Sequence, residues 1–266
     1  MNAIRVLTIT IPRLAGVFSG VSPVRFCLLL VSFWYFVISR KYFKRGKPQT
    51  FQLRYQNRQL RMRLFSPMDL AVLEEIFIKR EYEWRLPFSP RVIVDLGAHF
   101  GDTALYYHAL YPEARIIAVE PSPQTFDRLC HNVNGIEQIV PVQAGVADTD
   151  GVKELYVGPS SIGDSFTQRI STTTVSVPVY TLKTLLARQG VRHADLIKFD
   201  IEGAEELLFQ GAAPSEFSRA FIGEVHEDLM STNASEFLRC FDGFNIQTER
   251  LGNQRRMIIR CLEKQQ

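Results

Sequence analysis

One stretch of the sequence, residues 92–103, constrains the fold and function more than any other. It reads Val-Ile-Val-Asp-Leu-Gly-Ala-His-Phe-Gly-Asp-Thr, an apolar run followed by an acid and a Gly-x-x-x-Gly turn. The run at residues 91–96 is bounded by a proline and a glycine, which predicts a buried strand. Gly97 and Gly101 carry no Cβ atom, so the backbone can turn sharply and approach a ligand closely. Asp95 is therefore expected at the carboxyl end of a strand, where open α/β sheets bind ligands.

A second acid, Glu120, ends the next strand-like run and stands 25 positions after Asp95. An acid about 20 residues beyond a glycine turn is typical of a residue that binds ribose hydroxyls. Dinucleotide sites share this acid but need the pattern G-x-G-x-x-G, with a tight turn for the pyrophosphate. His99 stands where the middle glycine of that pattern would be. The sequence therefore favours a zwitterionic cofactor without phosphate, and a strand–helix turn without a ligand is the alternative.

Three blocks of the sequence together resemble the FkbM family of S-adenosylmethionine-dependent methyltransferases. They are residues 95–101, 119–123 and 197–205, and the last block is the most specific of the three. The resemblance covers residues 90–225, half of the chain. It implies an α/β fold with a doubly wound, Rossmann-like class I methyltransferase sheet and S-adenosyl-L-methionine as the cofactor.

The resemblance also implies a set of cofactor contacts. Glu120 is expected to bind the ribose hydroxyls and Ser122 to meet the adenine edge. Asp148, which follows the third strand, is expected to accept from the adenine amino group, although it could also be a plain turn residue. The other predicted cofactor residues are Asp95, Gly97, His99, Gly101, Thr103 and Asp200. His99 departs from the Asn often found at this turn but leaves the backbone role of the loop intact.

The predicted catalytic residues follow the fourth and fifth strands of the core. Glu202, just after Asp200, is the first candidate for contact with the acceptor or with the amino group of the cofactor. Glu224 and His226 alternate onto the same side of the fifth strand. A neutral His226 could accept a hydroxyl proton near pH 7, or it could be a surface histidine at a loop. A divalent metal at Asp200, Glu224 and His226 is conceivable, but the sequence does not require one.

Strands and helices alternate along the core, which predicts a mainly parallel sheet covered on both faces. Strands are expected at residues 91–96, 115–120, 138–143, 152–157, 174–180, 195–200, 219–225, 244–249 and 255–262. Helices are expected at residues 101–111, 122–134, 181–189, 203–210 and 233–241. The last two strands, joined around Gly252 and Asn253, predict one antiparallel strand at that end. Before the core, residues 48–66 predict a hairpin turning near Asn57, and residues 67–85 predict a helix.

The N-terminal quarter of the chain differs in charge from the rest. Residues 1–68 contain no Asp or Glu but 12 of the 31 Lys and Arg residues, so 19 basic residues face 28 acidic ones in the remainder. An acid-free basic arm favours an anionic partner such as a lipid surface. Nucleic acid is disfavoured because the centre of the arm is strongly apolar.

That apolar centre, residues 26–38, precedes a run of basic residues. As a helix it would span about 20 Å at 1.5 Å per residue, whereas a bilayer core needs about 30 Å. It predicts a short membrane-associated helix, either a re-entrant or interfacial anchor or a marginal span with Arg25 snorkelling. If it spans, the basic residues after it place the following domain in the cytoplasm. A core helix packed on the catalytic domain and a transit peptide are the alternatives. The basic residues are Arg40, Lys41, Lys44, Arg45 and Lys47.

We therefore expect three segments: residues 1–47 as a basic apolar anchor, residues 48–89 as a hairpin and helix, and residues 90–266 as the methyltransferase domain. Four scattered cysteines indicate neither a zinc site nor required disulfides, in agreement with a cytoplasmic protein. The expected activity is O-methylation of a hydroxyl on a sugar, glycolipid or secondary metabolite. A non-catalytic membrane-tethered scaffold and an NAD(P)-dependent oxidoreductase are the alternatives.

Overall fold

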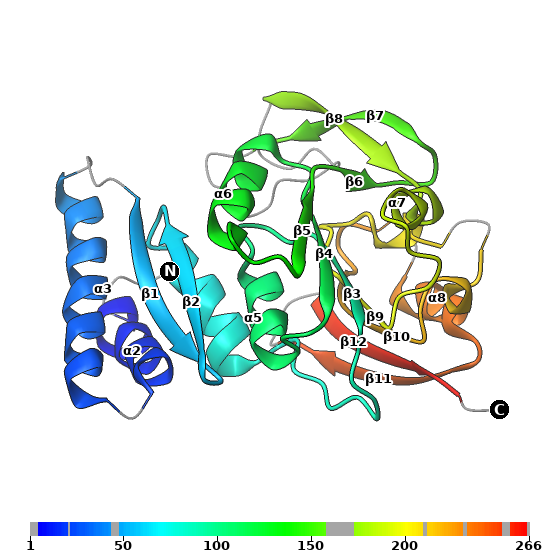
Figure 1. Ribbon diagram of the computed structural model, residues 1–266. Coiled ribbons are helices and arrows are strands. Elements are labelled where there is room, and N and C mark those ends of the chain that lie inside the picture. The colour runs from blue at the N-terminus through cyan, green and yellow to red at the C-terminus, as the bar shows by residue number, and fades with distance from the viewer. Residues whose placement is uncertain are drawn as a thin grey trace.

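The computed structural model describes residues 5–20, 22–43, 48–157, 173–209, 212–230, 233–251 and 256–264. A seven-stranded sheet lies at the centre of this part of the chain, in the order β11-β12-β10-β9-β3-β4-β5 (Figure 1). The strands are β3 (Val92–Leu96), β4 (Arg115–Val119), β5 (Ile139–Val142), β9 (Leu196–Phe199), β10 (Ala220–His226), β11 (Phe244–Arg250) and β12 (Arg256–Glu263).

The sheet is parallel except at one strand. β3 pairs in parallel with β4 and β9, β4 with β5, and β9 with β10. β12 runs antiparallel to both β10 and β11. This is the class I methyltransferase arrangement, so the predicted fold class and its antiparallel C-terminal strand are confirmed. The turn predicted at Gly252 and Asn253 lies outside the described residues.

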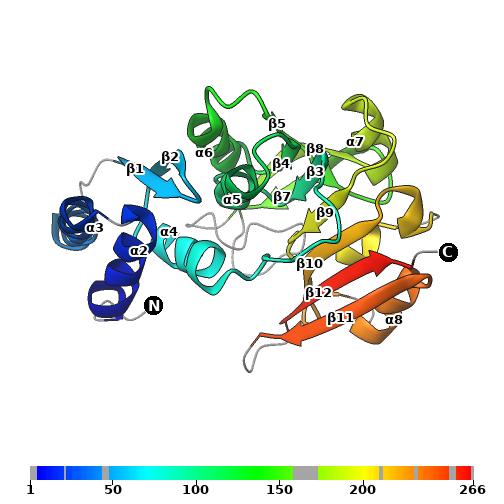
Figure 2. The same cartoon turned by 60° about the horizontal axis from the view of Figure 1, so that its bottom comes forward.

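The two faces of the sheet carry separate apolar cores because successive side chains of a strand point to opposite faces. Ile93 packs in one core with α5 (Asp102–Leu110) and α6 (Pro123–Val133). Val94 packs in the other core with α7 (Leu182–Arg188) and α8 (Ala234–Leu238). Helices therefore cover both faces, as Figures 1 and 2 show. Strands buried on both faces also explain the continuous apolar runs in the sequence.

A second, three-stranded sheet has the order β6-β8-β7. Its strands are β6 (Gly145–Val146), β7 (Gly151–Tyr156) and β8 (Thr174–Tyr180), which confirms the two extra strands predicted here.

The helix predicted at residues 203–210 is instead a single 3₁₀ turn at Glu205–Leu207. The backbone before it is left-handed, with φ of 52° at Glu202 and 96° at Gly203, so a regular helix cannot begin there. The Glu205 side chain accepts a hydrogen bond from the Gly203 amide. Gln210, at the end of the predicted helix, lies outside the described residues.

The helix predicted at residues 67–85 is shorter than expected. It comprises α4 (Asp69–Leu73) and the π-helical turn η2 (Glu74–Lys79), and it ends at Arg80, whose φ is 57°. The helix predicted at residues 233–241 is α8 followed by a 3₁₀ turn at Arg239–Phe241.

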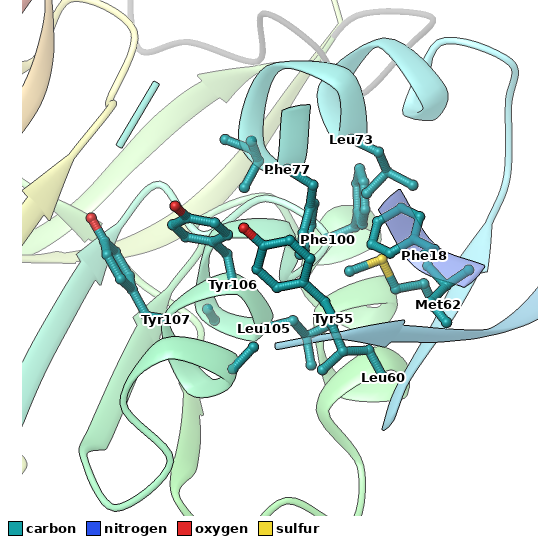
Figure 3. Close-up of a cluster of buried hydrophobic side chains, with 14 of the residues drawn as sticks. Phe18, Tyr55, Leu60, Met62, Leu73, Phe77, Phe100, Leu105, Tyr106 and Tyr107 are labelled. Atoms are coloured by element: carbon teal, nitrogen blue, oxygen red, sulfur yellow. The ribbon is translucent and has the colours of Figure 1, made fainter. Parts of the chain in front are cut away.

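The predicted hairpin is present as β1 (Gln49–Tyr55) and β2 (Arg58–Leu64), which pair in antiparallel register. Its apolar side chains are buried on alternate positions of both strands. α2 (Ile11–Ser19) and α3 (Pro23–Phe43) lie on the far side of this hairpin from α5 (Figure 1). The aromatic rings of Tyr55, Phe77 and Tyr106 pack together in one cluster, which joins the hairpin and η2 to α5 (Figure 3).

The N-terminal arm is therefore packed onto the core through the hairpin, as the core-helix alternative predicted. Part of its positive charge is also matched within the chain. Buried Glu74 accepts hydrogen bonds from Arg5, Arg13 and Thr10. Among the helices of the described residues, none combines the length and the apolar character that a membrane span requires. Of the predicted basic run, residues 44–47 lie outside the described residues.

Candidate active site

A cavity opens at the carboxyl ends of β3, β4, β9 and β10, where parallel sheets bind ligands. Of the twelve predicted site residues, seven line this cavity: Gly97, His99, Thr103, Glu120, Asp200, Glu202 and Glu224. Lining residues that were not predicted include Ala144, Gly145, Val146, Lys198 and Arg256, and Tyr82 also lines the cavity.

The glycine turn brings the chain close to its neighbouring strand. Gly97 has φ of 76°, and a Cβ atom there would lie 1.9 Å from the Asp200 carbonyl oxygen. No other residue fits at this position without moving the backbone. Gly101 has φ of 91° and lies against Leu129 of α6, with an ideal Cβ position 3.0 Å from that side chain. It permits close helix packing, and it is not among the described residues that line the cavity.

Glu120 is held by two backbone amides at the edge of the cavity. The His99 amide donates to Oε2 at 2.9 Å, and the Ser122 amide donates to Oε1 at 3.0 Å. Ser122 is itself buried and fixes Glu120 through its backbone rather than lining the cavity. A carboxylate offers about four lone-pair sites in all, of which these two amides take two.

Asp95 lies near the carboxyl end of β3, as predicted, but it is not among the described residues that line the cavity. Its side chain is fully buried and forms an ion pair of 3.0 Å with the buried amine of Lys198. That amine also donates to the Gly97 carbonyl at 2.8 Å. Burial raises the pKa of Asp95 to about 6 although Lys198 opposes the shift. Asp95 therefore positions Lys198, which in turn fixes the glycine turn.

His99 and Thr103 line the cavity beside Asp102. His99 Nδ1 lies 3.6 Å from Asp102 Oδ1. Burial alone would lower the pKa of His99, but the carboxylates of Asp102 and Glu120 raise it.

The acidic end of the cavity lies where β9 and β10 end. The Tyr82 hydroxyl donates to Asp200 Oδ2 at 2.9 Å. His226 Nε2 lies 3.8 Å from Asp200 Oδ1, 3.8 Å from Glu202 Oε2 and 3.4 Å from Glu224 Oε1. The structure thus brings the three predicted catalytic residues and Asp200 together, and Glu224 and His226 share a side as strand alternation predicts.

Two further residues complete this cluster. Fully buried Glu205 lies 2.7 Å from His226 Nδ1, and Arg256 of β12 forms a 2.8 Å ion pair with Glu224. Burial alone would lower the pKa of His226, but the hydrogen bond to Glu205 and the surrounding carboxylates raise it to about 9. Burial, with the charge of Asp200, raises the pKa of Glu224 to about 8. His226 is 1% exposed, so the surface-histidine alternative is wrong.

Asp148 does not reach the cavity. Its carboxylate is exposed and forms a 3.1 Å ion pair with Lys153, and residues 144–146 line the cavity on that side. Lys198 was missed in the sequence, although a lysine inside an apolar strand needs a buried partner and Asp95 stands on the next strand. Arg256 carried no such signal, because its role depends on the register of β12. Glu205 stands in the same acidic block as Asp200 and Glu202, but its contact with His226 depends on a 3₁₀ turn.

The chemistry of the cavity fits S-adenosylmethionine. Seven carboxylate side chains line its described part, against the strongly basic side chains of Lys198 and Arg256, which suits a ligand with cationic sulfonium and ammonium groups. Pro121, Val146 and Leu155 supply an apolar surface near Glu120, as an adenine ring requires.

Comparison with known proteins also indicates a methyltransferase. The methyltransferase FkbM domain family matches residues 95–244, more than half of the chain. The chain belongs to this family of S-adenosylmethionine-dependent methyltransferases.

Two curated relatives are methyltransferases. Methyltransferase sdnD of Sordaria araneosa is 27% identical over 67% of this chain and 83% of its own length. The hexuronic acid methyltransferase AglP of Haloferax volcanii is 26% identical over 55% of this chain and 61% of its own length. Among solved structures, Aeropyrum pernix fibrillarin in complex with S-adenosyl-L-methionine is similar at 16% identity and a TM-score of 0.44, over 81% of this chain and 82% of that one.

Proposed function

We propose that this protein methylates a hydroxyl oxygen of a sugar, glycolipid or secondary metabolite, with S-adenosylmethionine as the methyl donor. The observation that carries the proposal is one cavity with two chemically distinct ends. Glu120 lies at one end with two oxygens directed by backbone amides, and Glu202 and Glu224 lie at the other end with Asp200.

In this proposal Glu120 binds the ribose hydroxyls of the cofactor, and the negative charge of the carboxylates that line the cavity attracts its cationic groups. When bound, S-adenosylmethionine supplies an electrophilic methyl group on a sulfonium that leaves as a neutral thioether. The chain must then place an acceptor oxygen in line with that methyl group and remove the hydroxyl proton. The oxygen lone pair forms the new C–O bond as the S–C bond breaks.

We assign proton removal to Glu224. Its carboxylate lines the cavity, and Arg256 fixes it from the neighbouring strand. His226, which the sequence favoured as the base, lies behind these carboxylates and is not among the described lining residues. It is better placed to position them than to meet the acceptor itself.

The proposed acceptor, a hydroxyl-rich compound, rests on two observations. These are the carboxylates at the acidic end of the cavity and the name of one relative. Carboxylates suit hydroxyl-rich ligands because each oxygen accepts hydrogen bonds. The Haloferax volcanii relative is named for a hexuronic acid, which supports a carbohydrate acceptor here.

The direct test is transfer of a labelled methyl group from S-adenosylmethionine to fractionated cell extract, followed by mass analysis of the product. The proposal expects an ether-linked methyl group on a hydroxyl oxygen, and loss of the labelled product in Glu224→Gln. Label on nitrogen or carbon would refute O-methylation. Cofactor binding without transfer to any fraction would support the non-catalytic scaffold instead.

We also propose that α3 binds an anionic membrane surface. One face of this helix packs inward, with Leu29, Phe33 and Phe36 buried. The opposite face carries an exposed apolar stripe at spacings of four and three residues: Val24 (71% exposed), Leu28 (64%), Val31 (66%), Tyr35 (63%) and Ile38 (39%). Such a stripe in an acid-free basic segment is typical of a helix that lies in the membrane interface.

A further inference from the structure

We propose that Asp200, Glu202 and His226 bind a divalent metal ion at the acidic end of the cavity. The site itself stands on the geometry of these side chains. Its role in catalysis rests on the proposed methyl transfer to a hydroxyl.

The three side chains converge as metal ligands do. Asp200 Oδ1 and Glu202 Oε2 each lie 3.8 Å from His226 Nε2, and one ligand atom from each residue lies within 4.8 Å of the others. Metal–ligand bonds of about 2.1 Å place neighbouring ligand atoms roughly 3.0–4.2 Å apart, depending on the angle between them. An ion between these three atoms needs only small side-chain movements.

His226 provides an independent reason for a positive charge at this point. Its side chain is 2% exposed, and its Nδ1 lies 2.7 Å from the Glu205 carboxylate, which places a ring proton on Nδ1. Nε2 faces the oxygens of Asp200, Glu202 and Glu224 at 3.8, 3.8 and 3.4 Å. A buried lone pair that faces carboxylate oxygens is repelled unless a proton or a metal ion lies between them.

The ligands also have the outer contacts that metal sites use. The Tyr82 hydroxyl holds Asp200 Oδ2 and leaves Oδ1 facing His226. Glu205 holds Nδ1 of His226 and leaves Nε2 facing Asp200, Glu202 and Glu224. Carboxylate–histidine pairs of this kind fix the tautomer and ring orientation of a ligating histidine.

The ligand set favours a particular class of ion. Imidazole suits Zn²⁺ and other transition metals, whereas carboxylates also suit Mg²⁺ and Mn²⁺. One imidazole with two carboxylates therefore favours Mn²⁺ or Zn²⁺ over Ca²⁺, which takes more oxygen ligands. Such an ion would polarise the acceptor hydroxyl and lower its pKa, and the released proton would pass to Glu224 beside it.

The test is a titration of the full-length chain with Mn²⁺ in the absence of cofactor, followed by electron paramagnetic resonance. We expect one saturable Mn²⁺ per chain and a magnetic coupling to an imidazole nitrogen. His226→Gln and Asp200→Asn should each weaken Mn²⁺ binding about tenfold or more. Asp228→Asn, an exposed acid two residues after His226, is the matched control and should leave the affinity unchanged.

Glu202 is partly exposed, so Glu202→Gln should fold even if substitution of the buried His226 impairs folding. This variant therefore still tests whether the site binds Mn²⁺. The metal proposal is overturned if no saturable Mn²⁺ binding is seen at millimolar concentration. In that case a proton on Nε2, rather than a metal ion, lies between His226 and the carboxylates. The proposal is also overturned if Mn²⁺ binds equally to the wild type and to the His226 and Glu202 variants. If S-adenosylhomocysteine binds in the absence of metal, the proposed methyltransferase function is retained whether or not the metal site exists.

Discussion

Several single residues in the interior act through buried charges that are matched in pairs. Lys198 with Asp95, Arg128 with Asp69 and His226 with Glu205 each lie within hydrogen-bond distance in the interior. A buried charge without its partner costs several kcal/mol, so each pair behaves as a unit. The Asp95–Lys198 pair acts directly on the glycine turn, because the lysine amine donates to the Gly97 carbonyl.

The Asp95 carboxyl gives a pH-dependent prediction. Its pKa is about 6 in the fold, against 3.8 as a free side chain, so the folded state binds a proton that the unfolded state releases. This group therefore favours the fold less as pH rises from about 4 to about 6. Relative to Asp95→Asn, the wild type should lose on the order of 1 kcal/mol of unfolding free energy between pH 5 and pH 7.5. Urea denaturation of both proteins at the two pH values measures this difference, and a relative gain by the wild type on raising the pH would contradict it.

At the scale of elements, close contact between strands positions the cavity. β9 and β10 approach each other at Gly223, where a Cβ atom would lie 2.4 Å from the Phe199 ring and 2.5 Å from its carbonyl oxygen. This contact aligns Asp200 with Glu224 at the ends of the two strands. The carbonyl oxygen belongs to the sheet and cannot move aside as a flexible side chain would.

Gly223→Ala should therefore lower the free energy of unfolding by about 2 kcal/mol or more, because the sheet must open to admit the methyl group. Gly151→Ala is the control, since a Cβ atom at that position meets nothing within 4 Å. It should change stability by less than about 0.5 kcal/mol. Equal thermal melting temperatures for the two variants would contradict this close contact between β9 and β10 at Gly223.

The exposed stripe of α3 gives a prediction about membranes. The full-length chain should co-sediment with vesicles that contain phosphatidylserine, and Val31→Glu should reduce the bound fraction several-fold by placing a charge on the apolar face. Gln59→Glu adds the same charge on the exposed hairpin and should bind as the wild type does. Retention of every protein in the supernatant at low salt would rule out this role for α3.

For the whole molecule, the N-terminal arm and the catalytic core form one packed unit rather than a tether and a domain. Phe18, Tyr55 and Phe77 of the N-terminal part share a core with Tyr106 of α5 (Figure 3). Deleting residues 1–47 would expose the apolar face of the hairpin, so point substitutions on α3 test membrane binding more cleanly than truncation does.

The sequence predicts most of the sheet because each strand carries its own local pattern of apolar residues and turns. It also places Glu120, Asp200 and Glu224 at one sheet edge, since the carboxyl ends of parallel strands meet there. Asp95 could not be placed in this way, because the direction of its side chain depends on Lys198 of the neighbouring strand. The turn at Glu205 was missed because its backbone is set by a tertiary contact with His226 rather than by local propensity.

The most direct test of the central claim is calorimetric titration of the full chain with S-adenosylhomocysteine. The cofactor assignment predicts saturable binding at a ratio of one per chain, weakened about tenfold or more in Glu120→Gln because a charged acceptor of hydroxyl donors is lost. Glu137→Gln, an exposed acid outside the described lining, should bind as the wild type does. No binding at high micromolar concentrations, or equal affinity in the Glu120 variant and the wild type, would contradict the assignment.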